Sequence, residues 1–96
     1  MSRERGDRTK SKILAAGLEM WLENPNSVSA NGIGNRIGMK HASILYHFPY
    51  GVKDAVAEHA VNVGNSRVIA QLIVSEHPAV KNLSASDRMK HLKASI

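Results

Sequence analysis

The sequence of 96 residues contains no cysteine, and aromatic side chains are scarce. Without cysteine, neither a disulfide framework nor a thiolate metal site can form, and a reducing compartment is the natural setting. The core is expected to rest on Ile, Val, Leu, Met and Ala. No apolar run approaches the roughly 20 residues that span a bilayer, and the N-terminus is too polar for a signal peptide. The sequence therefore predicts a soluble, cytoplasmic chain without membrane contact.

Acidic residues are absent from positions 24–53, although this thirty-residue stretch contains three basic residues: Arg36, Lys40 and Lys53. The net charge of +5 is concentrated at the two ends. Residues 1–12 carry five basic and two acidic side chains (+3), and residues 81–96 carry four basic and one acidic side chain (+3). A basic segment beside an acid-free stretch indicates a polyanion as partner. The alternative is lysines and arginines scattered over the surface by chance.

A first helix is predicted from about Lys10, and it must end before Pro25 because the residue preceding proline is pushed out of the helical region. Its apolar face falls at i, i+4, i+7 and i+8 and consists of Leu14, Leu18, Trp21 and Leu22. Residues 1–9 show no periodicity and little to bury. They are expected to form a flexible basic arm.

A second, short helix is predicted over residues 30–37, with Ser29 as its N-cap. Ile33 and Ile37 are one turn apart and should both face inward. Gly38 is well placed to end this helix in the left-handed conformation. A tight link then leads to a third helix.

The third helix is predicted over about residues 40–47, with Ile44 and Phe48 as its buried i, i+4 pair. After Val52, three apolar residues again recur at helical spacing: Val56, Ala60 and Val63. Residues 64–66 either kink or split that helix, and an apolar helical face then continues toward Pro78. A last short helix is expected to start near Ser86.

No segment alternates between apolar and polar residues for long enough to form a strand, so the fold is predicted to be all-α. The expected organisation is a basic flexible arm (1–9), a helix-turn-helix three-helix bundle (10–63) and a short helical extension (64–96). Two short helices joined by a glycine turn and braced by longer helices are typical of helix-turn-helix proteins. In such proteins the second short helix lies in the DNA major groove.

The polar residues of this motif and the arginines of the arm are the candidate DNA-binding residues: Lys40, His41, Ser43, Tyr46, His47, Ser29, Asn31, Arg36, Lys53, Arg3 and Arg5. Lysine can donate to guanine, serine and histidine are adaptable donors or acceptors, and tyrosine can reach phosphate. Arg3 and Arg5 could enter a minor groove or belong to a solvated tail. The bland alternative for Lys40 and Tyr46 is ordinary solvated surface, and single histidines are often structural.

Four segments also resemble the DNA-binding domain of the TetR (tetracycline repressor) family: Ile13–Ala16, Ile33–Gly34, Gly38–Met39 and Ala42–Pro49. The resemblance covers about residues 9–63, and the spacing between the last three segments fits without a gap. It implies a homodimeric bacterial, phage or plasmid transcription repressor that reads a palindromic operator and is associated with the nucleoid. Double-stranded DNA and a second copy of the chain are the partners it implies.

This sequence departs from the family pattern at several positions. Glycine and isoleucine stand at 34 and 37, where the family usually has alanine, and Lys40 replaces a small polar cap. Leu45 stands in place of the family's tyrosine, and Gly51 in place of its lysine, although Lys53 follows two residues later. Family members also continue into a helical domain that binds an inducer and forms the dimer, whereas only residues 64–96 remain here.

One apolar helical face lies in this remaining segment and consists of Val68, Ile69, Leu72 and Ile73. It can be core or a dimerisation surface, and the shortness of the chain favours the dimer. Residues 64–96 offer too few side chains to enclose a pocket of the several hundred Å³ (roughly) that small-molecule sites have. No small-molecule inducer is therefore expected.

Two alternatives to a regulator remain. One is the DNA-binding subunit of an assembly such as a phage terminase small subunit, and the other is a TetR-like protein that acts through protein–protein contacts. An enzyme is not expected, because the sequence has no nucleophile–base pattern, P-loop or dinucleotide fingerprint. The five histidines lack metal-ligand spacing, so no metal or other cofactor is expected.

Overall fold

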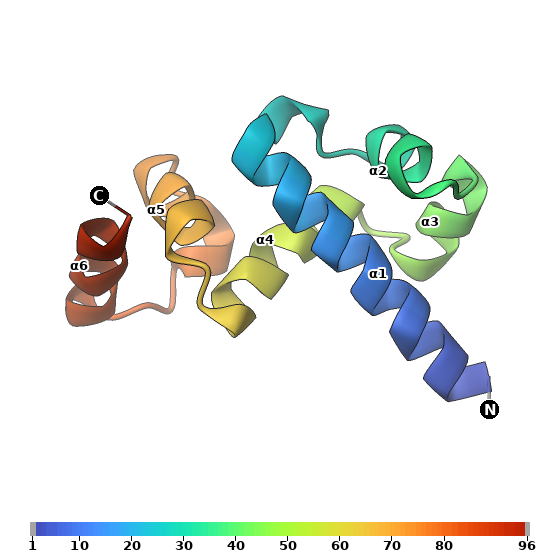
Figure 1. Ribbon diagram of the computed structural model, residues 1–96. Coiled ribbons are helices and arrows are strands. Elements are labelled where there is room, and N and C mark those ends of the chain that lie inside the picture. The colour runs from blue at the N-terminus through green and yellow to red at the C-terminus, as the bar shows by residue number, and fades with distance from the viewer. Residues whose placement is uncertain (1, 96) are drawn as a thin grey trace. The chain divides into compact units, whose positions relative to one another are not determined.

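The computed structural model describes residues 2–95, with the side chains of residues 7–95. Within residues 2–95 all regular structure is helical, which confirms the all-α prediction. No helix in this part of the chain is long and apolar enough to cross a membrane. In chain order the elements are α1 (Ser2–Glu23), η1 (Pro25–Ser27), α2 (Ala30–Ile37), α3 (His41–His47), α4 (Val52–Val63), α5 (Ser66–Val74), η2 (Pro78–Val80) and α6 (Ala85–Ala94) (Figure 1).

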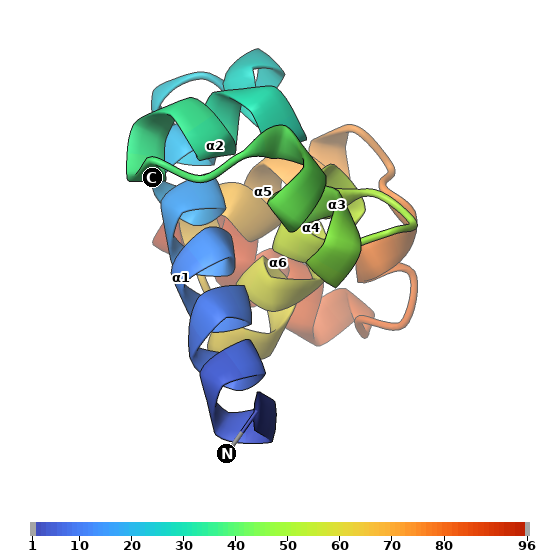
Figure 2. The ribbon, with the colours of Figure 1, turned by 90° about the vertical axis from the view of Figure 1, so that its right-hand side faces the viewer.

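The chain divides into two compact units, an N-terminal unit (1–56) and a C-terminal unit (57–96). The division falls inside α4, whereas the sequence pattern predicts a boundary at the end of that helix. In the N-terminal unit, α2 and α3 pack against each other and against α1 (Figures 1 and 2). In the C-terminal unit, α5 packs against α6 and η2.

Helix α1 is longer than predicted, because it begins at Ser2 rather than near Lys10. The prediction of a non-helical arm at residues 2–9 is therefore wrong for the backbone. Two pairs of opposite charges lie four residues apart in this segment, which favours a helix: Arg3 with Asp7, and Glu4 with Arg8.

The buried face of α1 also differs from the predicted one. Ile13, Ala16, Met20 and Trp21 are buried, whereas Leu22 is 40% exposed and Leu14 and Leu18 lie at the edges of the face. The cause lies at Gly17, where a Cβ atom would be 2.5 Å from Val56 Cγ2. Because Val56 approaches α1 so closely, the face is centred on the side of the helix that carries this glycine.

The α2–α3 segment follows the sequence prediction closely. Helix α2 has the predicted bounds, and the Ser29 hydroxyl accepts a hydrogen bond from the Gly32 N–H at 3.0 Å. Gly38 ends the helix with a φ of 71°, and both its N–H and that of Met39 donate to the Gly34 carbonyl. Helix α3 then starts at His41, one residue later than predicted.

Two of the four predicted inward residues of this segment are fully buried. Ile33 and Ile44 have no exposed surface, but Ile37 and Phe48 are only half-buried. Each of the half-buried residues lies at the C-terminal end of its helix, where the apolar contact with the neighbouring helix runs out. Ile33 is directed toward Gly17 of α1, and Ile44 toward Gly34 of α2.

In the C-terminal unit, Gly64 adopts a φ of 71° and separates α4 from α5, so of the two alternatives, a kink or a split, the structure has the split. Val63, predicted on the apolar face, is 56% exposed at the end of α4. Helix α6 starts after Ser84, whose hydroxyl accepts from the Asp87 N–H, and not at Ser86.

The predicted dimerisation surface is already occupied within the chain. Val68, Ile69 and Leu72 are buried, and Ile73 is half-buried. They lie on α5, the helix that α6 and η2 cover. Three polar contacts lie within the C-terminal unit: the Ser66 hydroxyl lies 2.9 Å from His91 Nδ1, and Arg88 donates to the Val80 and Leu83 carbonyls. The core interpretation of this face therefore replaces the dimer interpretation for Val68, Ile69 and Leu72.

Substitution of Gly34 should test the close approach of α2 to the turn. A Cβ atom there would lie 2.5 Å from the Met39 carbonyl oxygen, a backbone atom that cannot rotate away. The cost of overpacking should exceed the gain in helix propensity of about 1 kcal/mol, so we expect Gly34→Ala to lower the free energy of unfolding by about 1–2 kcal/mol. Urea denaturation measures this. Asn35→Ala, at the exposed neighbouring position, is the control, and a Gly34→Ala variant at least as stable as the control would contradict the account.

Candidate nucleic-acid interface

Helix α3 presents its polar side chains to solvent because Ile44 anchors its opposite side. With 100° between successive residues (roughly), Ala42 and Tyr46 lie on the side opposite Ile44. The Tyr46 side chain is 82% exposed, and Lys40, His41 and Ser43 are exposed as well. These four predicted site residues therefore share one accessible segment.

His47 differs from the other candidates on α3. It is half-buried, and its ring meets that of Tyr46 edge-on, with 5.3 Å between ring centroids and 82° between ring planes. This contact restricts the rotation of the Tyr46 side chain. His47 is thus better placed to orient Tyr46 than to reach a ligand itself.

The start of α2 contributes Ser29 and Asn31, which are both exposed. The Ser29 hydroxyl oxygen accepts a hydrogen bond from the Gly32 N–H and thereby caps α2. Its hydroxyl hydrogen can still donate outward, because serine has both functions. Asn31 is the freer of the two side chains to face a ligand.

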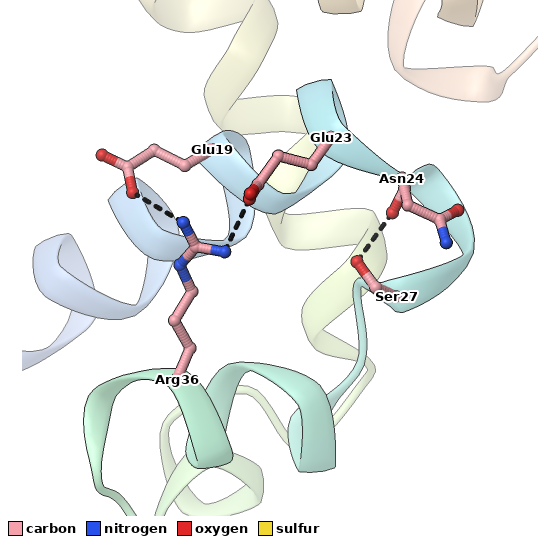
Figure 3. Close-up of polar contacts among 5 residues, drawn as sticks. All are labelled: Glu19, Glu23, Asn24, Ser27 and Arg36. Atoms are coloured by element: carbon pink, nitrogen blue, oxygen red, sulfur yellow. Dashed lines mark hydrogen bonds and ion pairs between the residues drawn. The ribbon is translucent and has the colours of Figure 1, made fainter.

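Arg36 is engaged by two carboxylates of α1, which the local sequence pattern does not predict. Its Nη1–H donates to Glu23 Oε2 at 2.6 Å, and its Nη2 lies 3.7 Å from Glu19 Oε2 (Figure 3). The acid-free stretch of sequence is therefore not acid-free in space. Because Arg36 is paired with these two carboxylates, it is less available for a phosphate contact than the sequence predicts.

Lys53, the second residue of α4, is exposed and lies over the Trp21 ring, with Nζ 5.5 Å from the ring centroid. A cation–π contact of this kind at an exposed site contributes about 0.5–1 kcal/mol. It keeps the ammonium at the surface of the N-terminal unit, where an anion can still approach it. The neighbouring Asp54 adds an opposing charge in the first turn of the same helix.

The side chains of Arg3 and Arg5 lie outside the described residues. Their backbone is part of α1, and the exposed basic side chains that follow on this helix are Arg8, Lys10 and Lys12. A basic first half of a helix thus stands where a basic arm was predicted. The charge of this segment is unchanged, but it is carried on a helix.

Two exposed residues close to α3 are absent from the set of site residues that the sequence predicts. Tyr50 is 96% exposed in the turn after α3, and Leu45 is 40% exposed beside the buried Ile44. The sequence spacing alone does not single out Leu45, because adjacent residues of a helix can both be buried, as Val68 and Ile69 are. Tyr50 lies between Pro49 and Gly51, whose φ of 117° marks a turn that projects the tyrosine outward.

Comparison of the chain with protein-family models, curated proteins and solved structures finds no match. Within the described residues, no three His, Asp or Glu side chains come together in a way that could hold a metal ion. The arrangement that remains is an exposed α3 bearing Lys40, His41, Ser43 and Tyr46. Chemically, it can donate and accept hydrogen bonds and present one aromatic ring.

Because of the orientation of α3, the adjacent residues Ile44 and Leu45 should contribute unequally to the free energy of unfolding. Ile44→Ala should lower the free energy of unfolding by about 2–4 kcal/mol, because it empties a fully buried site. Leu45→Ala, the matched control one position away, should change it by only about 0.5 kcal/mol. Chemical denaturation of both variants checks this. Equal losses, or a larger loss at Leu45, would mean that α3 is rotated from the orientation described.

Proposed function

We propose that this chain binds double-stranded DNA as a transcription regulator of the helix-turn-helix type, with α3 in the major groove. The observation that carries the proposal is the set of exposed polar residues on and just before α3, namely Lys40, His41, Ser43 and Tyr46, of which Tyr46 lies opposite the buried Ile44. An α-helix fits the major groove of B-DNA, where each base pair presents a distinct pattern of donors and acceptors. Short polar side chains on such a helix can approach base edges.

The residues of α3 suit different parts of the duplex. Lys40 can donate to the acceptors of guanine, and Ser43 and His41 can donate or accept at base edges. The phenol of Tyr46 can donate to a phosphate oxygen. Beyond α3, exposed basic residues of the same unit can add phosphate contacts: Arg8, Lys10, Lys12 and Lys53.

The resemblance to the TetR family supports the same function. The four segments that carry it lie in α1, in α2, in the Gly38 turn, and in α3 with the two residues after it. We further propose a homodimer that represses transcription from a palindromic operator, with two copies of α3 in successive major grooves about 34 Å apart. Because Val68, Ile69 and Leu72 are buried, the contact between copies must use other residues.

Two of the residues near α3 favour a second candidate, recognition of a protein partner. Leu45 replaces the tyrosine of the family pattern and is exposed, and Tyr50 is almost fully exposed. Exposed aromatic and aliphatic side chains are typical of the centres of protein interfaces. A chain that binds no duplex even at low salt would favour this candidate. A large ring in solution would instead favour a subunit of a DNA-packaging assembly.

Duplex binding should depend steeply on salt. If each protomer of a dimer neutralises roughly three phosphates, the log–log slope of affinity against salt concentration should be about −5. Fluorescence anisotropy with a labelled duplex between about 50 and 200 mM salt, where such losses are large, measures the slope. An affinity that does not change over this range would contradict the proposal.

Tyr46→Ala should weaken binding to a selected operator by about 1–3 kcal/mol, because it removes a side chain of α3 that is 82% exposed. Tyr46→Phe keeps the ring and removes only the hydroxyl, so it separates stacking from hydrogen bonding. Asn62→Ala, an exposed change on α4, is the control and should leave affinity unchanged. A folded Tyr46→Ala variant with full operator affinity would exclude α3 as the recognition helix.

A further inference from the structure

The ion cluster formed by Arg36, Glu19 and Glu23 joins two helices of the N-terminal unit. The two Nη atoms of Arg36, on α2, reach different carboxylates on α1, and these carboxylates are one helical turn apart (Figure 3). Arginine is suited to such a bridge because its donors are held in a planar fork. The cluster therefore connects α2 to the C-terminal part of α1 at two points, and a connection at two points restricts the rotation of α2 more than a single ion pair would.

Both carboxylates are unfavourable by the rules of an isolated helix. Glu19 and Glu23 are like charges at i, i+4, which repel each other. They also lie in the last two turns of α1, where the partial negative charge of the helix end disfavours anions. Arg36 offsets both effects at once. Residues that are unfavourable locally and paired across helices indicate a tertiary role.

Helix α2 depends on such contacts because it is weak on its own. It has eight residues, and its two glycines each cost about 1 kcal/mol relative to alanine. Arg36 lies two residues before Gly38, where the chain turns toward α3. A rotation of α2 would be transmitted to α3 because the two helices pack against each other: Ile44 Cδ1 of α3 would be 3.4 Å from a Cβ atom at Gly34 of α2.

We propose that Arg36 acts as a positioning residue: together with Glu19 and Glu23 it sets the orientation of α3 and does not contact phosphate. This inference rests on the proposed DNA-binding function. To bind phosphate, Arg36 would have to leave a hydrogen bond of 2.6 Å, and two carboxylates would repel the approaching anion. In its position the guanidinium instead serves as the link between α1 and the reading helix.

Glu23→Gln distinguishes a positioning role of Arg36 from a phosphate contact, because the first predicts weaker operator binding and the second predicts tighter binding. If Arg36 positions α3, Glu23→Gln and Arg36→Gln should each weaken operator binding about three- to tenfold, and the double variant should be no worse than either single variant. The salt slope should not change. If Arg36 contacts phosphate, Glu23→Gln should strengthen binding, and Arg36→Gln should reduce the magnitude of the salt slope by about 1 for each phosphate that Arg36 had neutralised.

Two further variants serve as controls. Glu58→Gln removes an exposed acid on α4 without touching the cluster, so it reports the general effect of removing one negative charge. Arg36→Lys keeps the charge but not the planar fork. Under the positioning role Arg36→Lys should weaken binding as Arg36→Gln does. An Arg36→Lys variant with full affinity, or tighter binding by Glu23→Gln than by Glu58→Gln, would overturn the inference.

Amide hydrogen exchange separates failure of this inference from failure of the proposed function. A parent chain that binds no duplex would refute the function, but the positioning role would still be measurable without DNA. Arg36→Gln and Glu23→Gln should then cause the same decrease in protection over residues 41–47. Unchanged protection in α3 would overturn the inference, whatever the parent binds.

Discussion

The N-terminal unit depends on one close approach, that of α2 to the turn and to α3 at Gly34. Helix α3 has only seven residues, and helices this short are not stable in water without tertiary contacts. Gly34 leaves room for the Met39 carbonyl and for Ile44 Cδ1, which would be 2.5 and 3.4 Å from a Cβ atom at this position. Ile44 can then be fully buried, and its burial determines which side chains of α3 face solvent.

The exposed side of α3 and the cluster around Arg36 follow from this contact. Burial of Ile44 turns Tyr46 and Ser43 outward, while Arg36 ties the same pair of short helices to the end of α1. The first basic residue of the acid-free stretch, Arg36, is thus paired within the unit. The charge available to a polyanion comes from Lys40, Lys53 and the first half of α1.

Local signals predicted the bounds of α2 but not the starts of α1 and α6, and signals between distant residues could not be read from the sequence. The cap at Ser29 and the left-handed Gly38 are set by neighbours in the chain, so the bounds of α2 could be predicted. The buried face of α1 could not be predicted, because two sets of apolar residues on this helix both have helical spacing: the leucines, and the residues from Ile13 to Met20. Only the approach of Val56 to Gly17 decides between them.

The same limit explains the errors at the candidate site and at the dimerisation surface. Arg36 and Glu23 are thirteen positions apart, and no local pattern joins them. The apolar residues of α5 read equally well as core or as interface until α6 is seen to pack against them. The exposure of Tyr46, in contrast, follows from the position of Ile44, because residues two positions apart lie on opposite sides of a helix.

The central claim is that α3 reads duplex DNA. Its most direct test is an NMR titration of the whole chain with a duplex selected from random sequences. The account predicts that the largest amide shift changes fall on residues 40–47, with little change when the duplex has the same length and a scrambled sequence. Changes of equal size for both duplexes, or changes confined to residues 66–94, would contradict it.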